Sequence, residues 1–351
     1  MLASVVHIQP LVTIRRERLL PIPGKVTVRK GQKVAATDII AEVDLDPKYT
    51  LLDVARGLGV SSDEADRYIQ SSLGSKVSSG DVLAGPLGFL KRVVRAPFEG
   101  EVVFTGEGVI LLKRESQIFG LKAGMPGLVA ELIEGRGAII TNTGVLVQGV
   151  WGNGQIDAGI LVGMAKRSDE VITPDKLDIS MRGLVVLAGH CAQSEVLMVA
   201  ADLPLRGMIL ASMDSRLATV ASKLKMPLIV LEGFGQIGMN SASYKLLTTN
   251  ERREVTINAE EWDRFTGKRP EVIIPLPAPE DMPLPRETFT YESGQTIRAL
   301  GSPYWGKIGR INRLLPDETQ IPNGLMVRAA EVKLENGSDS IIPLANLEVI
   351  A

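Results

Sequence analysis

The sequence predicts a multidomain protein of the mixed α/β class. At 351 residues the chain exceeds what one hydrophobic core supports comfortably, so two or three domains are expected. Its 35 glycines, its 20 prolines and an aromatic content of only 4% are typical of many turns and short strands. From about residue 180 to 276, apolar strand-like segments alternate with helix-like ones, which indicates an α/β domain.

Residues 1–123 are predicted to form a β domain made of hairpins. Residues 26–34 alternate apolar and polar side chains around a turn at Lys30–Gly31, and residues 74–84 repeat the pattern in shortened form. A further hairpin follows over residues 94–104. These segments resemble the biotinyl/lipoyl-type barrel-sandwich hybrid, in which two half-motifs of hairpins face each other. In such domains a lysine at a hairpin tip can be modified, but the proline and the insert beside Lys48 argue against that use.

A helical insert is expected within this domain at residues 48–72. Apolar residues recur at helical spacing from Leu51 to Leu58, and Ser61 with Glu64 forms a capping-box pattern. A helix-turn-helix DNA reader is the alternative interpretation. The second helix would open with three acidic residues that phosphates repel, so a structural insert is favoured.

Residues 124–165 contain ten glycines, and residues 166–276 carry the α/β pattern. The glycine-rich segment is expected to form short strands joined by tight turns. Its loop at residues 151–155 fits either a structural hairpin, which we favour, or a phosphate cradle. In the second segment, the predicted strands 183–187, 207–211 and 227–231 are almost wholly apolar, which is typical of a parallel sheet covered on both faces, and 254–258 is the expected fourth strand. We therefore expect a Rossmann-like or swivelling α/β domain.

A proline-rich linker at residues 277–290 precedes a final β module at residues 291–351. Asn336–Gly337 is the strongest hairpin signal in the sequence. Residues 301–311 carry the glycines of an SH3-like barrel of the KOW type, and residues 343–350 resemble its closing strand. Many such modules bind RNA, yet from Arg286 onward seven basic residues face eight acidic ones, so nucleic-acid binding is not expected. We expect a protein partner instead, at the following residues: Tyr304, Trp305, Lys307 and Arg310.

Taken over nearly its full length, the chain resembles an uncharacterised bacterial family associated with the glutamate mutase accessory protein MutL. The resemblance rests on residues 20–26, 144–152, 232–239 and 269–274, besides the final module. It implies the domain architecture given above. It implies no activity, because none is established for that family.

The strongest candidate for a ligand site is a glycine loop, Gly233, Gly235 and Gly238. It follows an apolar strand and precedes a helical segment, as a dinucleotide-binding turn does. Glu260, after the next predicted strand, is available to hold a ribose. Glu232 weakens this interpretation, because its carboxylate lies close to the expected phosphate position. The same turn also serves as a purely structural connection between a strand and a helix, which is the interpretation we favour.

The sequence offers little other site chemistry. One cysteine and two histidines exclude a cysteine-rich metal cluster and leave little for a histidine-based one. His190 and Cys191 are adjacent, so their side chains diverge and a nucleophile–base contact is not expected. We therefore predict no metal, no cofactor and no catalytic residues. The net charge of −2 argues against a protein that coats nucleic acid or a membrane, and with no targeting or membrane-spanning segment in view we expect a cytoplasmic location.

These observations favour a non-enzymatic scaffold or assembly protein that acts through protein–protein contacts and forms a homo-oligomer. A nucleotide-binding or small-molecule-binding enzyme or sensor, centred on the loop from Gly233 to Gly238, is the alternative. A factor that associates with RNA or the ribosome through the final module is a weaker one.

Overall fold

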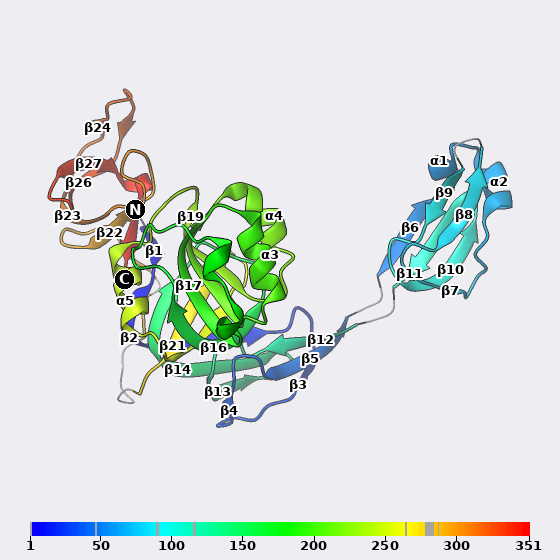
Figure 1. Cartoon of the computed structure of the whole chain (residues 1–351), viewed down its shortest axis with the longest axis horizontal. Helices are drawn as coiled ribbons and strands as arrows, with labels where there is room; N and C mark the ends of the chain where they lie inside the picture. The colour runs from blue at the N-terminus through cyan, green and yellow to red at the C-terminus, as the bar shows by residue number, and fades with distance from the viewer. Residues whose placement is uncertain are drawn as a thin grey trace. The chain divides into compact units, whose positions relative to one another are not determined.

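A computed structural model describes residues 2–45, 48–88, 91–114, 117–263, 265–277, 284–286 and 288–351. The chain divides into two compact units. Unit 1 consists of Met1–Leu19, Val26–Ile40 and Leu121–Ala351, and unit 2 of Leu20–Lys25 and Ala41–Gly120. Strands dominate both units (Figure 1). A three-stranded sheet of β12 (Gln117–Lys122), β5 (Ile39–Leu45) and β3 (Lys25–Val26) contains the strands through which the chain passes from one unit to the other.

Unit 2 is a small β structure around its own core. Its main sheet has the order β6-β11-β10-β7 and is made of Tyr49–Asp53, Val109–Lys113, Gly100–Gly106 and Lys76–Val77, respectively. A hairpin of β8 (Val82–Leu87) and β9 (Arg92–Arg95) forms a second sheet. Val54, Leu58, Val102, Ile110 and Leu112 lie in the shared core.

The helical insert begins later than the sequence predicts. Residues Tyr49–Asp53 form β6, and α1 runs only from Val54 to Leu58, with the Asp53 carboxylate accepting a hydrogen bond from Arg56 N at 2.8 Å. Two short helices follow, α2 (Ser62–Ala65) and η1 (Asp66–Tyr68). Ser61 precedes α2, but within the described residues its side chain makes no capping hydrogen bond. The helical spacing misled because Leu51 and Leu52 lie in β6, where exposed and half-buried residues alternate as they do in a strand.

The large sheet of unit 1 has eleven strands. In spatial order they are β15 (Trp151–Gly152), β19 (Leu228–Phe234), β18 (Gly207–Met213), β17 (Leu184–Cys191), β16 (Ile156–Gly163), β20 (Glu254–Asn258), β21 (Glu271–Pro275), β14 (Gly137–Gln148), β13 (Gly127–Ile133) and β4 (Lys33–Val34), with β2 (Ile8–Leu19) also paired to β14. Strands β16 to β19 are mutually parallel. The predicted strand at residues 254–258 is present, but it runs antiparallel to β16 and so does not extend the parallel set.

The sheet closes on itself at β14 and β15. Gln148, at the end of β14, pairs with Glu271 of β21, and three residues later Trp151 pairs with Val230 of β19. A single stretch of chain therefore joins the two ends of a ring of strands. One core cluster takes alternate residues from β14, β16, β17, β18, β19, β20 and β21 and includes Leu247 of α5 (Ser241–Thr249). A second cluster lies on the other face, under α3 (Ser194–Asp202) and α4 (Ala218–Ala221) (Figure 1).

The glycine-rich segment belongs to this sheet and does not form a small sheet of its own. Several of its glycines lie where another backbone approaches too closely for a side chain. A Cβ at Gly144 would lie 2.2 Å from Ile274 O, and one at Gly152 would lie 2.3 Å from Ala259 O. The Gly154 N–H donates to the same Ala259 carbonyl at 2.6 Å. The loop at residues 151–155 therefore packs its backbone against Ala259 and has a structural role in the sheet.

The final module is an antiparallel sheet joined at its edge by the start of the chain. Its strands are β22 (Thr296–Ala299), β23 (Ile308–Leu314), β26 (Ala329–Leu334), β27 (Asp339–Pro343) and β28 (Leu347–Ile350), with β1 (Ser4–Val6) parallel to β28. A short hairpin of β24 (Thr319–Gln320) and β25 (Met326–Val327) projects from it, and η5 (Leu344–Asn346) precedes β28. The predicted turn at Asn336–Gly337 joins β26 to β27, and Gly337 has a φ of +85°. Half of the linker predicted at 277–290 lies outside the described residues.

Two four-stranded arrangements in the chain follow one pattern. Repeat A, in unit 1, has the order β4-β13-β14-β2, and repeat B, in unit 2, has the order β7-β10-β11-β6. In repeat A the Gly31 N–H donates to Val129 O at 2.8 Å, and the Asp38 carboxylate accepts from Ala35 N at 2.8 Å. The matching hydrogen bonds in repeat B are Gly74 N to Val102 O and Ser78 N to Asp81 Oδ2, both at 2.7 Å.

This duplication corrects the predicted domain at residues 1–123. The segment around Gly31 and its echo around Gly74 are not two halves of one compact domain, because they belong to different units. Each completes a sheet with its own hairpin, which for repeat A arrives only after residue 121. Repeat B is thus inserted in the chain between β4 and β13 of repeat A.

Candidate functional site

The carboxyl ends of the parallel strands β17, β18 and β19 lie at one edge of the ring, the position where open α/β sheets bind ligands. The glycine loop lies there, between β19 and α5, in the strand–turn–helix order that the sequence predicts. Gly233 and Gly235 have φ values of +137° and +100°. Gly235 is exposed: a Cβ added there would meet no atom within 4 Å beyond its chain neighbours, and its N–H donates to Met213 O at 3.0 Å. Gly238 is more confined, since its Cβ would lie 3.2 Å from Asp169 Cβ.

The N-terminus of α5 is closed by the protein's own side chains. The Asn240 side chain accepts a hydrogen bond from Ser243 N at 2.9 Å. Glu232 Oε1 in turn accepts from Asn240 N at 2.9 Å and from Asn240 Nδ2 at 2.6 Å. Glu232 is buried, so its carboxylate places a negative charge where a pyrophosphate would have to bind.

Glu260 does not join the glycine loop. It follows β20, whose last residue, Asn258, pairs with Ile156 at the start of β16. Because β16 is parallel to β17, β18 and β19, Glu260 lies at the opposite edge of the ring from Gly233. There it forms a bidentate ion pair with Arg18, in which Arg18 Nη2 donates to Glu260 Oε1 at 2.7 Å. Burial acts to raise the pKa of Glu260, but the hydrogen bonds and charge of Arg18 outweigh it, so the pKa is lowered.

His190 and Ser212 form a buried pair beneath the loop. Ser212 Oγ donates to Ile237 O at 2.6 Å and accepts from Ile237 N at 3.1 Å. Its single proton is therefore used, and His190 Nδ1, 2.9 Å from Ser212 Oγ, acts as the donor to it. Burial lowers the pKa of His190, and the charge of Asp214 only partly opposes this effect. The pair fastens the glycine loop to β17 and β18.

Cys191 makes no catalytic pair with His190. Its Sγ lies 3.6 Å from Gln193 O, and its side chain is fully buried. Burial raises the pKa of this thiol to about 11, so it is protonated at neutral pH. The expected divergence of the two adjacent side chains is observed, and neither has the environment of an activated nucleophile.

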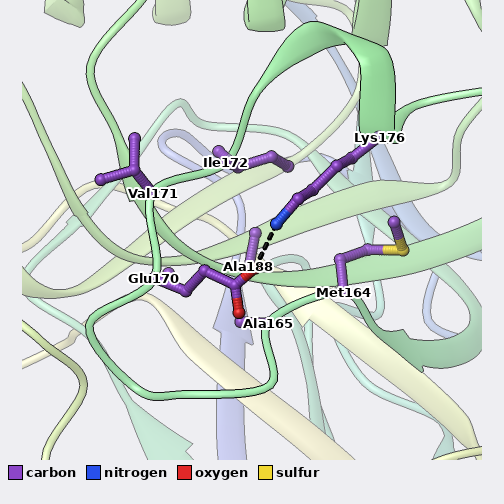
Figure 2. A pocket seen from close by; sticks show the side chains of 8 residues that line it. Met164, Ala165, Glu170, Val171, Ile172, Lys176 and Ala188 are labelled. Carbon is purple, nitrogen blue, oxygen red and sulfur yellow. Dashed lines mark hydrogen bonds and ion pairs between the residues drawn. The ribbon is translucent and has the colours of Figure 1, made fainter.

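A small cleft opens beside the carboxyl ends of β16 and β17 (Figure 2). Figure 2 shows Lys176, from η2 (Pro174–Lys176), reaching across the cleft to an ion pair with Glu170. The Glu170 carboxylate also accepts from Lys166 N at 2.7 Å, and its pKa is lowered, first by the hydrogen bond from Lys176. The two charges that line the cleft therefore neutralise each other. The rest of the lining is largely apolar, with Met164, Ala165 and Ile172 among it.

The four predicted partner-binding residues do not form one surface. Tyr304 packs against the core of the final module, whereas Trp305 is 51% exposed and Lys307 is exposed beside it. This loop contacts the glycine loop, because a Cβ at Gly306 would lie 3.0 Å from Ile237 Cγ2. Arg310 lies apart on β23, where its Nε donates to Gly294 O at 2.7 Å.

Arg310 lines a shallow groove of about 340 Å³ on the face of the final module. Lys333 and Asn312 line it as well, and Glu335 places an acid in the same groove. Thr296, Arg310 and Lys333 form one row across β22, β23 and β26. The row ends at Asp339 of β27, and Glu335 lines the same groove, so two acids balance the two cations and no strong basic patch results.

A buried ionic cluster, which the sequence analysis missed, joins the final module to the ring. Arg298 Nη1 donates to Glu232 Oε2 at 2.8 Å, and Arg298 also forms an ion pair with Glu348. Arg269 Nη2 donates to the other oxygen of Glu348 at 2.6 Å, and its guanidinium stacks over the Trp262 ring at 4.3 Å. All four charged side chains of the cluster are buried. The signal in the sequence is a charged residue within an otherwise apolar strand, as in Leu228–Phe234 and Leu347–Ile350.

Glu348 remains ionised at neutral pH. Burial acts to raise the pKa of Glu348, but the charges of Arg298 and Arg269 outweigh burial and hold the pKa below its usual range. The cluster's two cations and two carboxylates balance, which is the condition for burying charge in a core. The cluster is therefore structural, and it sets the final module against the carboxyl-terminal edge of the ring.

The comparisons with protein-family models and with curated proteins give no match. Among the residues that the structure describes, no group of three or more His, Cys, Asp or Glu side chains is placed to hold a metal ion. In the same residues, no helix is long and apolar enough to cross a membrane.

Proposed function

We propose that the protein is a non-enzymatic scaffold or assembly protein that acts through protein–protein contacts. The observation that carries this proposal is an apolar row on the outer face of repeat B. Leu51, Leu111 and Phe104 lie side by side on β6, β11 and β10. Leu51 is 62% exposed and Phe104 is 43% exposed, and Tyr49, also on β6, is 57% exposed. Aromatic and aliphatic side chains in such a row are typical of a protein interface.

Repeat A indicates that the fold does not require this row to be apolar. The equivalent row in repeat A is Glu17, Ile139 and Glu131, across β2, β14 and β13. The position equivalent to Tyr49 is Arg15, which forms an ion pair with Glu131 at 3.3 Å. The middle position is apolar in both repeats, but the two outer positions, Leu51 and Phe104 in repeat B, are glutamates in repeat A. The apolar face of repeat B therefore calls for a functional explanation.

The glycine loop supports the alternative, a nucleotide-binding enzyme or sensor, less well. The backbone of Gly235 is open, but Glu232 and Asn240 occupy the start of α5, and Glu260 lies at the other edge of the ring. In our proposal the protein needs no cofactor and works in the cytoplasm. The hairpins of residues 1–123 are of the lipoyl-like barrel-sandwich type, residues 166–276 form a Rossmann-like or swivelling α/β domain, and the final module is an SH3-like barrel. Membership of the family associated with MutL remains a prediction from sequence resemblance.

A photo-crosslinking experiment in the native host tests the proposal. A photoreactive phenylalanine analogue is placed at Phe104, and as a matched control at Phe265, which is fully exposed in unit 1. We expect a protein adduct from position 104 and none from position 265. The proposal is overturned if position 104 gives no more adduct than the control. It is also overturned if a panel of nucleotides binds the wild type and Gly235→Val abolishes that binding without changing the unfolding midpoint.

A further inference from the structure

We propose that the partner of repeat B is a second copy of this chain, which pairs with it through β6 about a two-fold axis. This inference rests on the proposed function and specifies its partner. Within the described residues no strand pairs with the outer edge of β6, and the side chains of Tyr49 and Leu51 on the same strand are exposed. One strand therefore supplies both the backbone contacts and the side-chain contacts.

The backbone of β6 presents an open edge. In its sheet β6 is the end strand, paired with β11. Arg114 N donates to Lys48 O at 2.8 Å, and Val54 N donates to Gly108 O at 2.9 Å. In an antiparallel pair, successive residues direct their backbone N–H and C=O groups alternately toward the partner strand and away from it. Because Lys48 and Val54 bond to the β11 side, the even-numbered residues of β6 direct their backbone groups toward β11. The backbone groups of Tyr49, Leu51 and Asp53 therefore point toward the open edge.

This edge lacks the protection that edge strands usually have. Charged side chains on an edge strand prevent it from pairing with other chains. In repeat A the corresponding strand, β2, carries four consecutive charged residues, Arg15 to Arg18. In β6 the residues from Tyr49 to Leu52 are uncharged, and Asp53 is the first acid. The edge of repeat A is built against strand pairing, and that of repeat B is not.

The register of a symmetric strand pair is set by Tyr49, Leu51 and Asp53, whose backbone groups point toward the open edge. Antiparallel pairing centred on Leu51 sets Leu51 opposite Leu51 of the second copy and Tyr49 opposite Asp53 of the second copy. Each facing pair can then exchange both backbone hydrogen bonds, and no charge meets a like charge. The row of Phe104, Leu111 and Leu51 continues directly into the same row of the second copy.

The helix that follows β6 leaves room for this pairing. Val54 and Leu58 of α1 are in the core of unit 2, so the chain turns beneath the sheet and away from its edge. The resulting sheet would contain two copies of repeat B. An interface made of one strand pair and a short apolar row is at the small end of stable interfaces, so we expect a dimer of micromolar affinity.

A charge-swap experiment at the two-fold axis tests the inference. Leu51→Asp and Leu51→Lys each place two like charges opposite each other, so each variant of the full chain alone should dimerise at least about tenfold more weakly than the wild type. A mixture of the two should form a one-to-one heterodimer in analytical ultracentrifugation. Leu73→Asp is the matched control, because Leu73 is 68% exposed in the same unit but lies outside β6, and it should leave dimerisation unchanged.

Disulfide capture gives an independent measurement. Leu51→Cys should form an intermolecular disulfide under mild oxidation, and Leu73→Cys should not. The single native cysteine, Cys191, is buried and does not compete. A wild type that is monomeric at 100-fold above the expected affinity range, about 0.1 mM, overturns the inference. So does a dimer that withstands both Leu51 charge variants.

Failure of this inference and failure of the proposed function give different results. If the purified wild type is monomeric but Phe104 still crosslinks to another protein in the host, the scaffold proposal holds and the second copy is excluded as the partner. If the Leu51 variants behave as expected but the only crosslinked protein from position 104 is a second copy of the chain, then self-assembly is the only protein–protein contact made by this face. If neither adduct nor dimer is found, both proposals fall.

Discussion

The buried ionic cluster gives the sharpest prediction about stability. Arg298 contacts two carboxylates, with Nη1 2.8 Å from Glu232 Oε2 and Nε 3.1 Å from Glu348 Oε2. Arg298→Met keeps most of the side-chain volume but removes one of two cations from a cluster of four charges, so the cluster changes from neutral to a net charge of −1. Removing one partner of a buried ion pair costs about 3–5 kcal/mol, because the remaining charge is stranded away from water.

The assay is urea unfolding followed by tryptophan fluorescence. All three tryptophans, Trp151, Trp262 and Trp305, belong to unit 1, so the signal reports the unit that holds the cluster. Arg313→Met is the matched control, because Arg313 pairs with Glu331 on the surface, where solvent screens the pair and its loss should change stability little. The two substitutions are chemically identical and differ in burial.

The pH dependence adds a second test. In the wild type the pKa of Glu348 is held below its usual range, so its contribution to stability is present above the unfolded pKa and is lost as the pH falls through the folded pKa. In Arg298→Met, Glu348 keeps only Arg269 as a cationic partner while burial still acts to raise its pKa, so the pKa of Glu348 should be higher than in the wild type. The stability deficit of the variant should therefore shrink as the pH falls from 7 toward about 5. A deficit equal to that of Arg313→Met, or one that does not vary with pH, would refute the reasoning.

Three further predictions concern buried groups and close approaches. Burial, followed by the charge of Arg16, lowers the pKa of His7 to about 4, so between the unfolded pKa and pH 4 the unfolded chain binds more protons. In urea unfolding, the free energy of unfolding of the wild type should fall by up to about 3 kcal/mol as the pH drops from 7 to 4. His7→Gln should remove this part of the pH dependence. The same pH dependence of the unfolding free energy in both proteins would contradict the prediction. The Cys191 thiol, with its pKa raised to about 11, should react with an aromatic disulfide reagent at pH 8 only on unfolding, and rapid reaction of the native protein would count against its burial. Gly144→Ala places a Cβ 2.2 Å from a backbone carbonyl oxygen and should lower the free energy of unfolding by more than about 3 kcal/mol. Gly324→Ala, at an open position with a φ of +87°, should lower it by about 1 kcal/mol. Similar urea midpoints for the two variants would refute the packing argument.

The sequence by itself identified which segments are buried strands and where several turns fall. The strands β17, β18 and β19 were predictable because a strand buried on both faces consists of apolar residues. The turn at Asn336–Gly337 was predictable because a positive φ favours glycine. The glycine loop was likewise predicted between a strand and a helix. The echo of residues 26–34 at residues 74–84 was visible too, and it reflects a real duplication.

The tertiary structure alone decided which strands pair and in which direction. The residue types of β20 report its burial but cannot report that it runs antiparallel to β16, and that direction is what takes Glu260 away from the glycine loop. For the same reason the echoing segments gave no sign that each completes a different unit. The partners of Arg298 come from strands far apart in the sequence, so their compensation is invisible until the strands meet. Side-chain periodicity records the environment of each residue, whereas pairing is set by long-range packing that the chain reaches only when folded.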